Sequence, residues 1–214
     1  GEILRQEALN LKEGALQAAL SAFVGEYEQL PPMFSAVKMN GKRLYELARR
    51  GEEIQRKRRK VAITRLELLS AQMNMEHPLV RFDVTCSKGT YIRTLCADIG
   101  EKLGCGAYMS FLVRTRVGPF LLENAHTLEQ IKECREEGKL ATLLLPSDLV
   151  FFRYPEIILD DVMLSRFLNG AEIGAEAFQP SEEIVRVYEK TNSFIGLGKI
   201  FFRNDQKILR AYRL

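Results

Sequence analysis

The sequence predicts an α+β fold in two parts, residues 1–149 and residues 150–214. Three observations lead to this prediction. Apolar and polar side chains alternate over 79–86, which is typical of a half-buried strand, and apolar side chains recur at helical spacing over 91–103. The prolines around 146–155 then separate the longer elements before them from shorter ones after them, which indicates a domain boundary.

The first expected elements are a helix and, after it, a basic segment with a turn and a short helix. We expect Asn10 to cap a helix that ends at Gly25. The paired prolines after Gln29 predict an extended segment, Asn40-Gly41 predicts a tight turn, and a short helix is expected over 42–50. The side chains expected on the inner face of the first helix are Leu16, Ala19, Leu20, Phe23 and Val24.

In the middle of the chain, segments with the alternation of a strand are followed by segments with the spacing of a helix. Strands are expected over 60–71, 79–86 and 111–117, and a helix over 91–103 that ends at Gly104. We expect a further helix from its cap at Thr127 to Gly138, with Leu128 and Ile131 facing inward.

The C-terminal part predicts a compact β-rich module. A helix should open at Asp160 or Asp161 and end at Asn169-Gly170. Strands are expected over 183–188, 193–202 and 207–213, with Asn204-Asp205 as a turn. About sixty residues are enough for such a module to fold alone.

Composition excludes several classes of protein. Hydrophobic residues make up 46% and charged residues 28% of 214 residues, which is typical of a soluble globular chain and not of a disordered or fibrous one. No apolar run approaches the length that crosses a bilayer, and the N-terminus lacks a signal-peptide core. Because the chain begins with Gly1 and not with Met, we expect a segment upstream.

The cysteines favour packing over chemistry. Their spacing contains no Cys-x-x-Cys pair, and His77 and His126 complete no zinc pattern, so no metal site is expected. Reduced thiols packed as small hydrophobes are the preferred interpretation, with a redox or metal role as the alternative. The cysteines are Cys86, Cys96, Cys105 and Cys134.

Positive charge is concentrated in one segment. Residues 38–60 hold ten Lys or Arg and three acids, a local charge of +7, which leaves −4 for the rest of a chain whose total is +3. A basic arm of this kind predicts salt-sensitive binding to nucleic acid. The alternative is a solvated charged loop.

The stretch from Val84 to Arg93 carries the strongest chemical signal. Gly89 permits a sharp turn at the strand end, and Tyr91 and Arg93 then lie in the first turn of a helix. This pairing suits an anion, or a flipped-out base that stacks on the ring. A plain capped helix with Arg93 in a structural ion pair explains the pattern equally well, whereas a hydrolase is disfavoured because no histidine lies nearby in sequence.

Several ordered blocks are similar to the TruB family of tRNA pseudouridine synthases. Residues 29–38, QLPPMFSAVK, resemble that family's Q-x-P-P-x-x-S-A-x-K signature, and residues 86–95, CSKGTYIRTL, resemble its C-S-K-G-T-Y-I-R-T-L block. Residues 41–51, 98–107 and 112–115 continue the match. The resemblance runs from residue 1 to about 145 and more weakly to the C-terminus.

The resemblance implies a fold and an activity. The fold would be part of a catalytic domain with a mixed, mainly antiparallel sheet and flanking helices, followed by a small PUA-like RNA-binding domain. The activity would isomerise the T-loop uridine at position 55 of tRNA to pseudouridine, without cofactor or metal. The base would be flipped out, and a catalytic Asp would attack the nucleoside so that the base detaches, turns and rejoins through carbon.

The resemblance also assigns residues and partners. Tyr91 would contact the flipped base, Leu112 would line its pocket and Arg93 would orient the catalytic Asp. The basic insertion at about 30–60 would grip the T-arm, and the PUA-like domain would contact the acceptor end; no membrane and no obligate protein partner are implied. The expected RNA-binding residues are Lys38, Lys42, Arg43, Arg49, Arg56, Lys57, Arg58, Arg59, Lys88 and Arg114.

The family's G-H-x-G-T-L-D-P block, which supplies the nucleophilic Asp, is not among these 214 residues, and neither is its K-x-Y segment. We transfer the nucleophile's role to no other aspartate and expect the chain alone to be inactive, to bind RNA weakly and to self-associate. The alternative function is a non-catalytic RNA-binding or tRNA-folding module. A cytoplasmic location is expected for either.

Overall fold

The computed structural model describes residues 13–39, 41–75, 77–179 and 184–212. The chain divides into two compact units, Gly1–Leu112 and Val113–Leu214, which are considered separately below. The boundary expected between 149 and 150 stays a prediction. The described helices are all too short or too polar to span a bilayer.

An antiparallel sheet of three strands forms the frame of the first unit. Its order is β1–β4–β5, so that the long strand β4 lies in the centre. The expected strands at 60–71 and 79–86 are confirmed, while β1 was not expected as a strand. The bounds are Gly25–Gln29 for β1, Arg59–Gln72 for β4 and Leu79–Cys86 for β5.

Helices α1 (Glu13–Ser21) and α3 (Ile92–Leu103) form a common core with this sheet. Leu16, Ala19 and Leu20 of α1 are buried, as the spacing predicts. In α3, Leu95 and Ile99 are buried, while Ile92, Cys96 and Leu103 are partly buried. The expected end of the first helix is wrong, because α1 ends at Ser21 and Gly25 instead begins β1. Val24 is accordingly 48% exposed and not inward. The expected cap, Asn10, lies outside the described residues. The core residues are Leu16, Leu20, Ile63, Leu66, Leu95 and Ile99.

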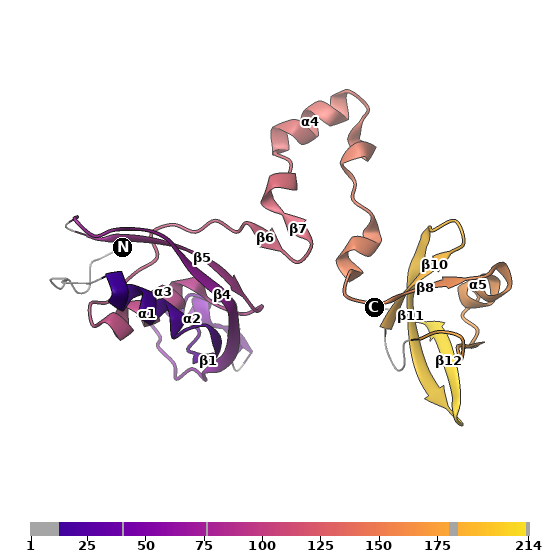
Figure 1. Cartoon of the computed structure of the whole chain (residues 1–214), viewed down its shortest axis with the longest axis horizontal. Coiled ribbons are helices and arrows are strands. Elements are labelled where there is room, and N and C mark those ends of the chain that lie inside the picture. The colour runs from indigo at the N-terminus through magenta and orange to yellow at the C-terminus, as the bar shows by residue number, and fades with distance from the viewer. Residues whose placement is uncertain (1–12, 40, 76, 180–183, 213–214) are drawn as a thin grey trace. The chain divides into compact units, whose positions relative to one another are not determined.

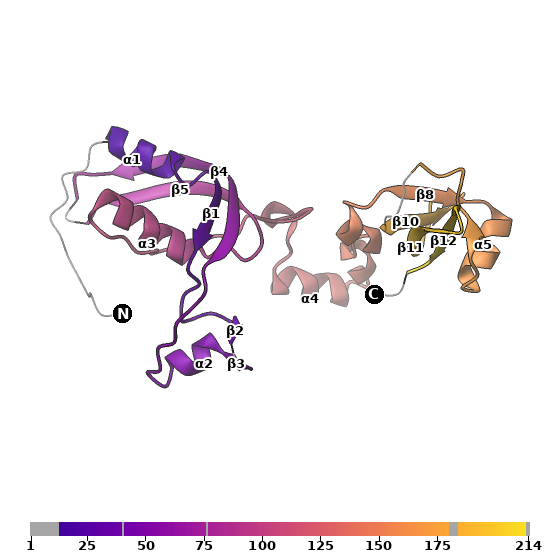
Figure 2. The same ribbon diagram turned by 90° about the horizontal axis from the view of Figure 1, so that it is seen from below.

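A small lobe leaves the sheet after β1 and returns at β4. Figure 2 shows this lobe beyond the ends of β1 and β4, away from α1 and α3. Gly41 has φ +79°, in keeping with the expected turn, while Asn40 lies outside the described residues. The expected helix over 42–50 is shorter, because residues 42–43 pair with β2 before it begins. The lobe contains β2 (Lys38–Met39), β3 (Lys42–Arg43) and α2 (Leu44–Ala48).

Residues 105–155 contain only short elements. The strand expected over 111–117 is wrong except at its end, where β6 (Arg116–Val117) pairs with β7 (Phe120–Leu121). Alternation favours a strand only where a partner completes the ladder, and 111–115 have none among the described residues. The other elements are η1 (Leu122–Asn124), α4 (Leu128–Glu136), η2 (Leu140–Leu143) and η3 (Ser147–Phe151).

Helix α4 begins as expected, with Thr127 and Gln130 forming a reciprocal capping box. The expected inward face is wrong, since Leu128 is 72% and Ile131 37% exposed. Helical periodicity identifies an apolar face but not what covers it. In this segment most of the apolar side chains remain exposed.

A five-stranded sheet in the order β8–β10–β11–β12–β9 ends the chain (Figure 1). Among the strand pairs that the structure describes here, only β8–β10 is parallel. The three expected strands, the turn at Asn204-Asp205 and the helix capped by Asp160 are confirmed, whereas β8 and β9 were not expected. Val185, Val187, Ile200 and Leu209 are fully buried in its core. The elements are β8 (Glu156–Leu159), α5 (Asp161–Leu168), β9 (Ile173–Gly174), β10 (Ile184–Glu189), β11 (Phe194–Arg203) and β12 (Gln206–Ala211).

Candidate active site

The turn between β5 and α3 is held by its own side chains. Thr90 Oγ1 donates to the Ser87 carbonyl at 2.9 Å, and Gly89 adopts φ +85°. Ser87 also ties the turn to β4, since its Oγ accepts from the Ala62 N–H at 2.9 Å and its own N–H donates to the Ala62 carbonyl at 2.7 Å. Tyr91 is therefore presented at the N-cap position of α3 by a fixed turn.

Gln29 clamps the backbone of Tyr91 from the end of β1. Its Oε1 accepts from the Tyr91 N–H at 2.7 Å, and its Nε2 donates to the Tyr91 carbonyl at 3.1 Å. The same Nε2 contacts the Tyr27 hydroxyl. Gln29 is 1% exposed, so both bonds lie away from water. A buried amide that satisfies both backbone groups of one residue holds that residue firmly.

Gln29 was not expected to have this role. Its signal in the sequence was a polar residue two positions before Pro31-Pro32, in the QLPPMFSAVK block. The 29–38 block therefore contacts the start of α3 at two points. Gln29 binds the Tyr91 backbone, and Arg93 Nη2 donates to the Phe34 carbonyl at 2.7 Å. The two quoted blocks, about sixty residues apart, meet in space.

Arg93 is exposed and uses one of its five N–H groups on Phe34. The remaining donors can take a carboxylate, which is the partner the resemblance implies. The expected alternative, a structural ion pair for Arg93, has no counterpart among the described residues. Leu112, the last residue of the first unit, is 48% exposed, and its place in a base pocket stays a prediction.

Most described aspartates serve structural roles. Asp83 forms an ion pair with Arg65, and Asp160 caps α5. Asp148 accepts a hydrogen bond from the Tyr188 hydroxyl, and Asp161 forms an ion pair with Lys190 at 2.9 Å.

Asp98, on α3, is half-buried. Burial raises its pKa, the Arg58 guanidinium opposes the shift and Glu101 adds to it. Burial, helped by Asp98, raises the pKa of Tyr27 to about 12. Burial also raises the pKa of the Cys96 thiol. All four cysteines are free thiols, and a raised pKa argues against a reactive one at Cys96.

The basic segment is anchored by carbonyls and an aromatic ring. Arg56 donates to the Pro31 carbonyl at 3.0 Å and Arg58 to the Glu28 carbonyl at 2.9 Å. Arg43 and Arg49 lie 5.9 Å and 5.5 Å from the centre of the Tyr45 ring. The expected RNA-binding side chains are exposed apart from Arg56, so most of their charge faces solvent.

A hollow of about 90 Å³ lies within this lobe. Pro31, Val37, Met39 and Leu44 supply its apolar wall, and Arg56, Lys57 and Arg59 supply its basic side. Lys88 is exposed in the β5–α3 turn, and Arg114 is exposed in the second unit, which is not positioned relative to the first.

Comparison with known proteins covers almost the whole chain. Residues 1–92 match the family described as TruB family pseudouridylate synthase (N terminal domain). Residues 93–151 match the tRNA pseudouridylate synthase B C-terminal domain, and residues 155–214 match Pseudouridine synthase II TruB, C-terminal.

Curated relatives agree with these matches. A tRNA pseudouridine synthase B of Clostridium kluyveri is 40% identical over 201 residues, 92% of this chain and 67% of that protein. One of Burkholderia mallei is 42% identical over 204 residues, 93% of this chain and 66% of that protein. This chain belongs to the TruB family. It spans about two thirds of the length of these relatives.

Solved structures share the TruB-family fold. A crystal structure of a Cbf5–Nop10–Gar1 complex matches with a TM-score of 0.71 at 24% identity, covering 95% of this chain and 62% of that one. An H/ACA RNP bound to a substrate RNA containing 2′-deoxyuridine matches with a TM-score of 0.70 at 21% identity, covering 98% of this chain and 63% of that one. The C-terminal sheet is consistent with a PUA-like domain.

Proposed function

We propose that this TruB-family chain acts in a tRNA pseudouridine synthase, an isomerase that converts the T-loop uridine at position 55 to pseudouridine. The bond from ribose to the base nitrogen breaks, the base turns, a bond from ribose to the base carbon forms, and the proton on that carbon leaves. The observation that carries this proposal is the meeting of the two TruB blocks at Tyr91 and Arg93.

The geometry supports specific roles around the flipped base. Tyr91 presents an aromatic ring from a backbone that Gln29 fixes, which suits contact with a base taken out of its stack. Arg93 has free guanidinium donors for the catalytic Asp, and a nearby guanidinium keeps a carboxylate ionised. Leu112 supplies an apolar wall. These roles need no cofactor and no metal.

The RNA contacts follow the distribution of charge. The exposed cations of 38–60, with Lys88 and Arg114, would bind the phosphates of the T-arm, and the PUA-like module would contact the acceptor end. The T-arm and the acceptor end are both parts of tRNA, on which the curated relatives act by their names. The protein would then work in the cytoplasm, together with its tRNA.

Tritium release from T-arm RNA labelled at the uridine carbon tests the function. The 214-residue chain should bind this RNA without turnover, because the G-H-x-G-T-L-D-P block is not among its residues. Joined to an N-terminal segment that carries such a block, it should release tritium. Arg93→Lys should then lower turnover more than binding, because an ammonium cannot reproduce the bidentate guanidinium.

The second candidate is a non-catalytic RNA-binding or tRNA-folding module, which the exposed cations of 38–60 would serve equally well. That module would bind and refold tRNA equally well with or without the added block and would release no tritium in either form. Turnover by the 214-residue chain alone would refute the expected inactivity, and failure to bind T-arm RNA in either form would refute both candidates.

A further inference from the structure

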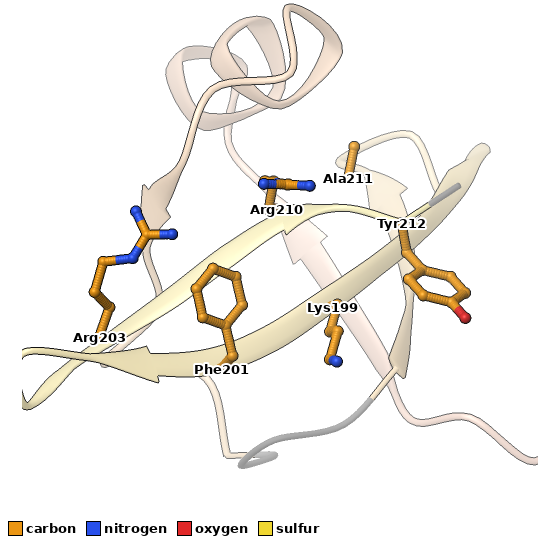
Figure 3. Close-up of a pocket in the computed structure, with 6 residues that line it drawn as sticks. All are labelled: Lys199, Phe201, Arg203, Arg210, Ala211 and Tyr212. Atoms are coloured by element: carbon orange, nitrogen blue, oxygen red, sulfur yellow. The ribbon is translucent and has the colours of Figure 1, made fainter. Parts of the chain in front are cut away.

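The outer face of β11 and β12 carries a groove of about 360 Å³ whose six lining residues include no acid. Figure 3 shows Lys199, Phe201 and Arg203 on one strand, Arg210 on its neighbour, and Tyr212 directly after the end of that neighbouring strand. The alternation along β11 explains this arrangement, because Ile200 points into the core while the residues on either side of it point out.

Two cations face each other directly across this sheet. Lys199 is the cross-strand partner of Arg210, and both are exposed. Like charges in this position destabilise an antiparallel pair. No carboxylate in the described part of the chain forms an ion pair with either one. An anion placed between them would relieve the repulsion, so the pair favours an anionic ligand.

Aromatic rings interleave with the cations. The Arg203 guanidinium lies 5.6 Å from the centre of the Phe201 ring, and an ion pair of 2.7 Å with Glu172 holds Arg203 in place. Tyr212 lies at the other end of the groove and donates its backbone N–H to the Leu197 carbonyl at 2.8 Å. Aromatic faces for bases beside cations for phosphates are the pattern of proteins that bind single-stranded nucleic acid.

This part of the sheet is open, whereas the start of β11 is covered. There η3 packs against the strand, with Phe151 stacked on Phe194 at 6.1 Å, and Asp148 accepts from the Tyr188 hydroxyl. A small-molecule site would be more enclosed and more apolar than the groove farther along the strand.

We infer that the β11–β12 groove binds a short single-stranded stretch of RNA, with a base stacked on Phe201 and phosphates on Lys199 and Arg210. The inference deepens the proposed function and rests on it for the source of the RNA, a single-stranded part of the tRNA. All six residues that line the groove belong to the C-terminal module.

An eight-residue oligoadenylate tests the groove, because it contains no uridine and no T-arm. Binding to the whole chain is measured by fluorescence anisotropy over a range of salt concentrations. In Lys199→Gln/Arg210→Gln, affinity should fall about tenfold or more, and the slope of log affinity against log salt should shrink by about 1.4, for two phosphate contacts on a single strand. Lys132→Gln/Arg135→Gln on α4 makes the same charge change and should bind as the unaltered chain does.

Stacking is tested separately by Phe201→Ala, with an oligoadenylate that carries 2-aminopurine at one position. The unaltered chain should change the fluorescence of this base, and the substitution should abolish the change and weaken binding about fivefold or more. Phe202→Ala, on the neighbouring residue of the same strand, is the control and should leave both measurements unaltered. Circular dichroism of each variant checks that the sheet is intact.

The outcomes separate this inference from the proposed function. Loss of oligoadenylate binding with T-arm binding retained supports the groove. Equal oligoadenylate binding by groove variants and controls overturns it, even if T-arm turnover is confirmed. A chain that binds T-arm RNA but no oligoadenylate also overturns it. So does binding of phosphatidylserine vesicles that only the groove variants lose, without any RNA binding, because the ligand would then be a lipid surface.

Discussion

Replacing Gln29 by Leu removes the clamp on Tyr91 and keeps a side chain of similar size. Both hydrogen bonds are lost, which leaves the Tyr91 N–H without its partner, while the Tyr91 carbonyl still accepts from the Leu95 N–H at 3.0 Å. Each buried backbone group left unsatisfied costs about 1–3 kcal/mol, and the apolar side chain returns part of this. With one such group left unsatisfied, we expect the free energy of unfolding to fall by about 1–3 kcal/mol.

Urea unfolding followed by far-ultraviolet circular dichroism measures the effect, since the chain has no tryptophan. With a slope of about 2 kcal/mol per molar urea, the midpoint should fall by roughly 0.5–1.5 M. Hydrogen exchange should show faster exchange at the start of α3 than in α5. Gln55→Leu changes an exposed glutamine in the same way and should shift the midpoint little.

The comparison can refute the reasoning directly. If Gln29→Leu unfolds at the same urea concentration as Gln55→Leu, the two bonds to Tyr91 contribute nothing net. If the midpoint falls but exchange at the start of α3 is unaltered, the substitution acts on the core and not through the clamp.

Four further outcomes are expected. Charge reversal of the four cations at 56–59 should weaken T-arm binding more than tenfold at low salt and flatten its salt dependence, and unaltered affinity in filter binding would contradict the role of this segment. Gly100→Ala should destabilise the first unit by about 1–3 kcal/mol or more in thermal unfolding, because the added methyl would lie 2.2 Å from the Ala107 nitrogen. Tyr27 should titrate near pH 12 by ultraviolet absorbance, and because its pKa is higher in the folded state than the ordinary 10.0, its contribution to stability should be intact below pH 10 and lost as the pH rises towards 12. The chain should self-associate in light scattering, because apolar side chains such as Phe111 and Leu144, 80% and 75% exposed, face solvent; a strictly monomeric species would contradict this.

Local signals predicted those elements whose partners are near in sequence. Strand β5 and helix α3 were expected almost to the residue, because their periodicity and the turn at Ser87–Thr90 are local. Thr127 and Asp160 were expected as caps for the same reason. Caps and turns depend on a few neighbouring residues, so one sequence is enough to find them.

Elements whose form depends on a distant partner were missed or misread. β1 has a polar, unremarkable sequence and is a strand because β4 pairs with it. The reverse holds at 111–115, where alternation is present but no strand in the described part of the chain pairs with it. Gln29 belongs to the same class, since its role depends on a turn 62 residues away. The candidate site could be located from Tyr91 and Arg93, but the residues that hold it could not.

The pairing of β1 with β4 has a consequence for how this family can vary. Gln29 and Arg59 are opposite each other in the ladder, so the basic lobe between them leaves the sheet and re-enters it at one place. Such an excursion can lengthen, shorten or exchange its charged residues at a small entropic cost, because closing a loop depends only weakly on its length. The basic lobe can therefore diverge in length and in charge while the register of the sheet stays fixed.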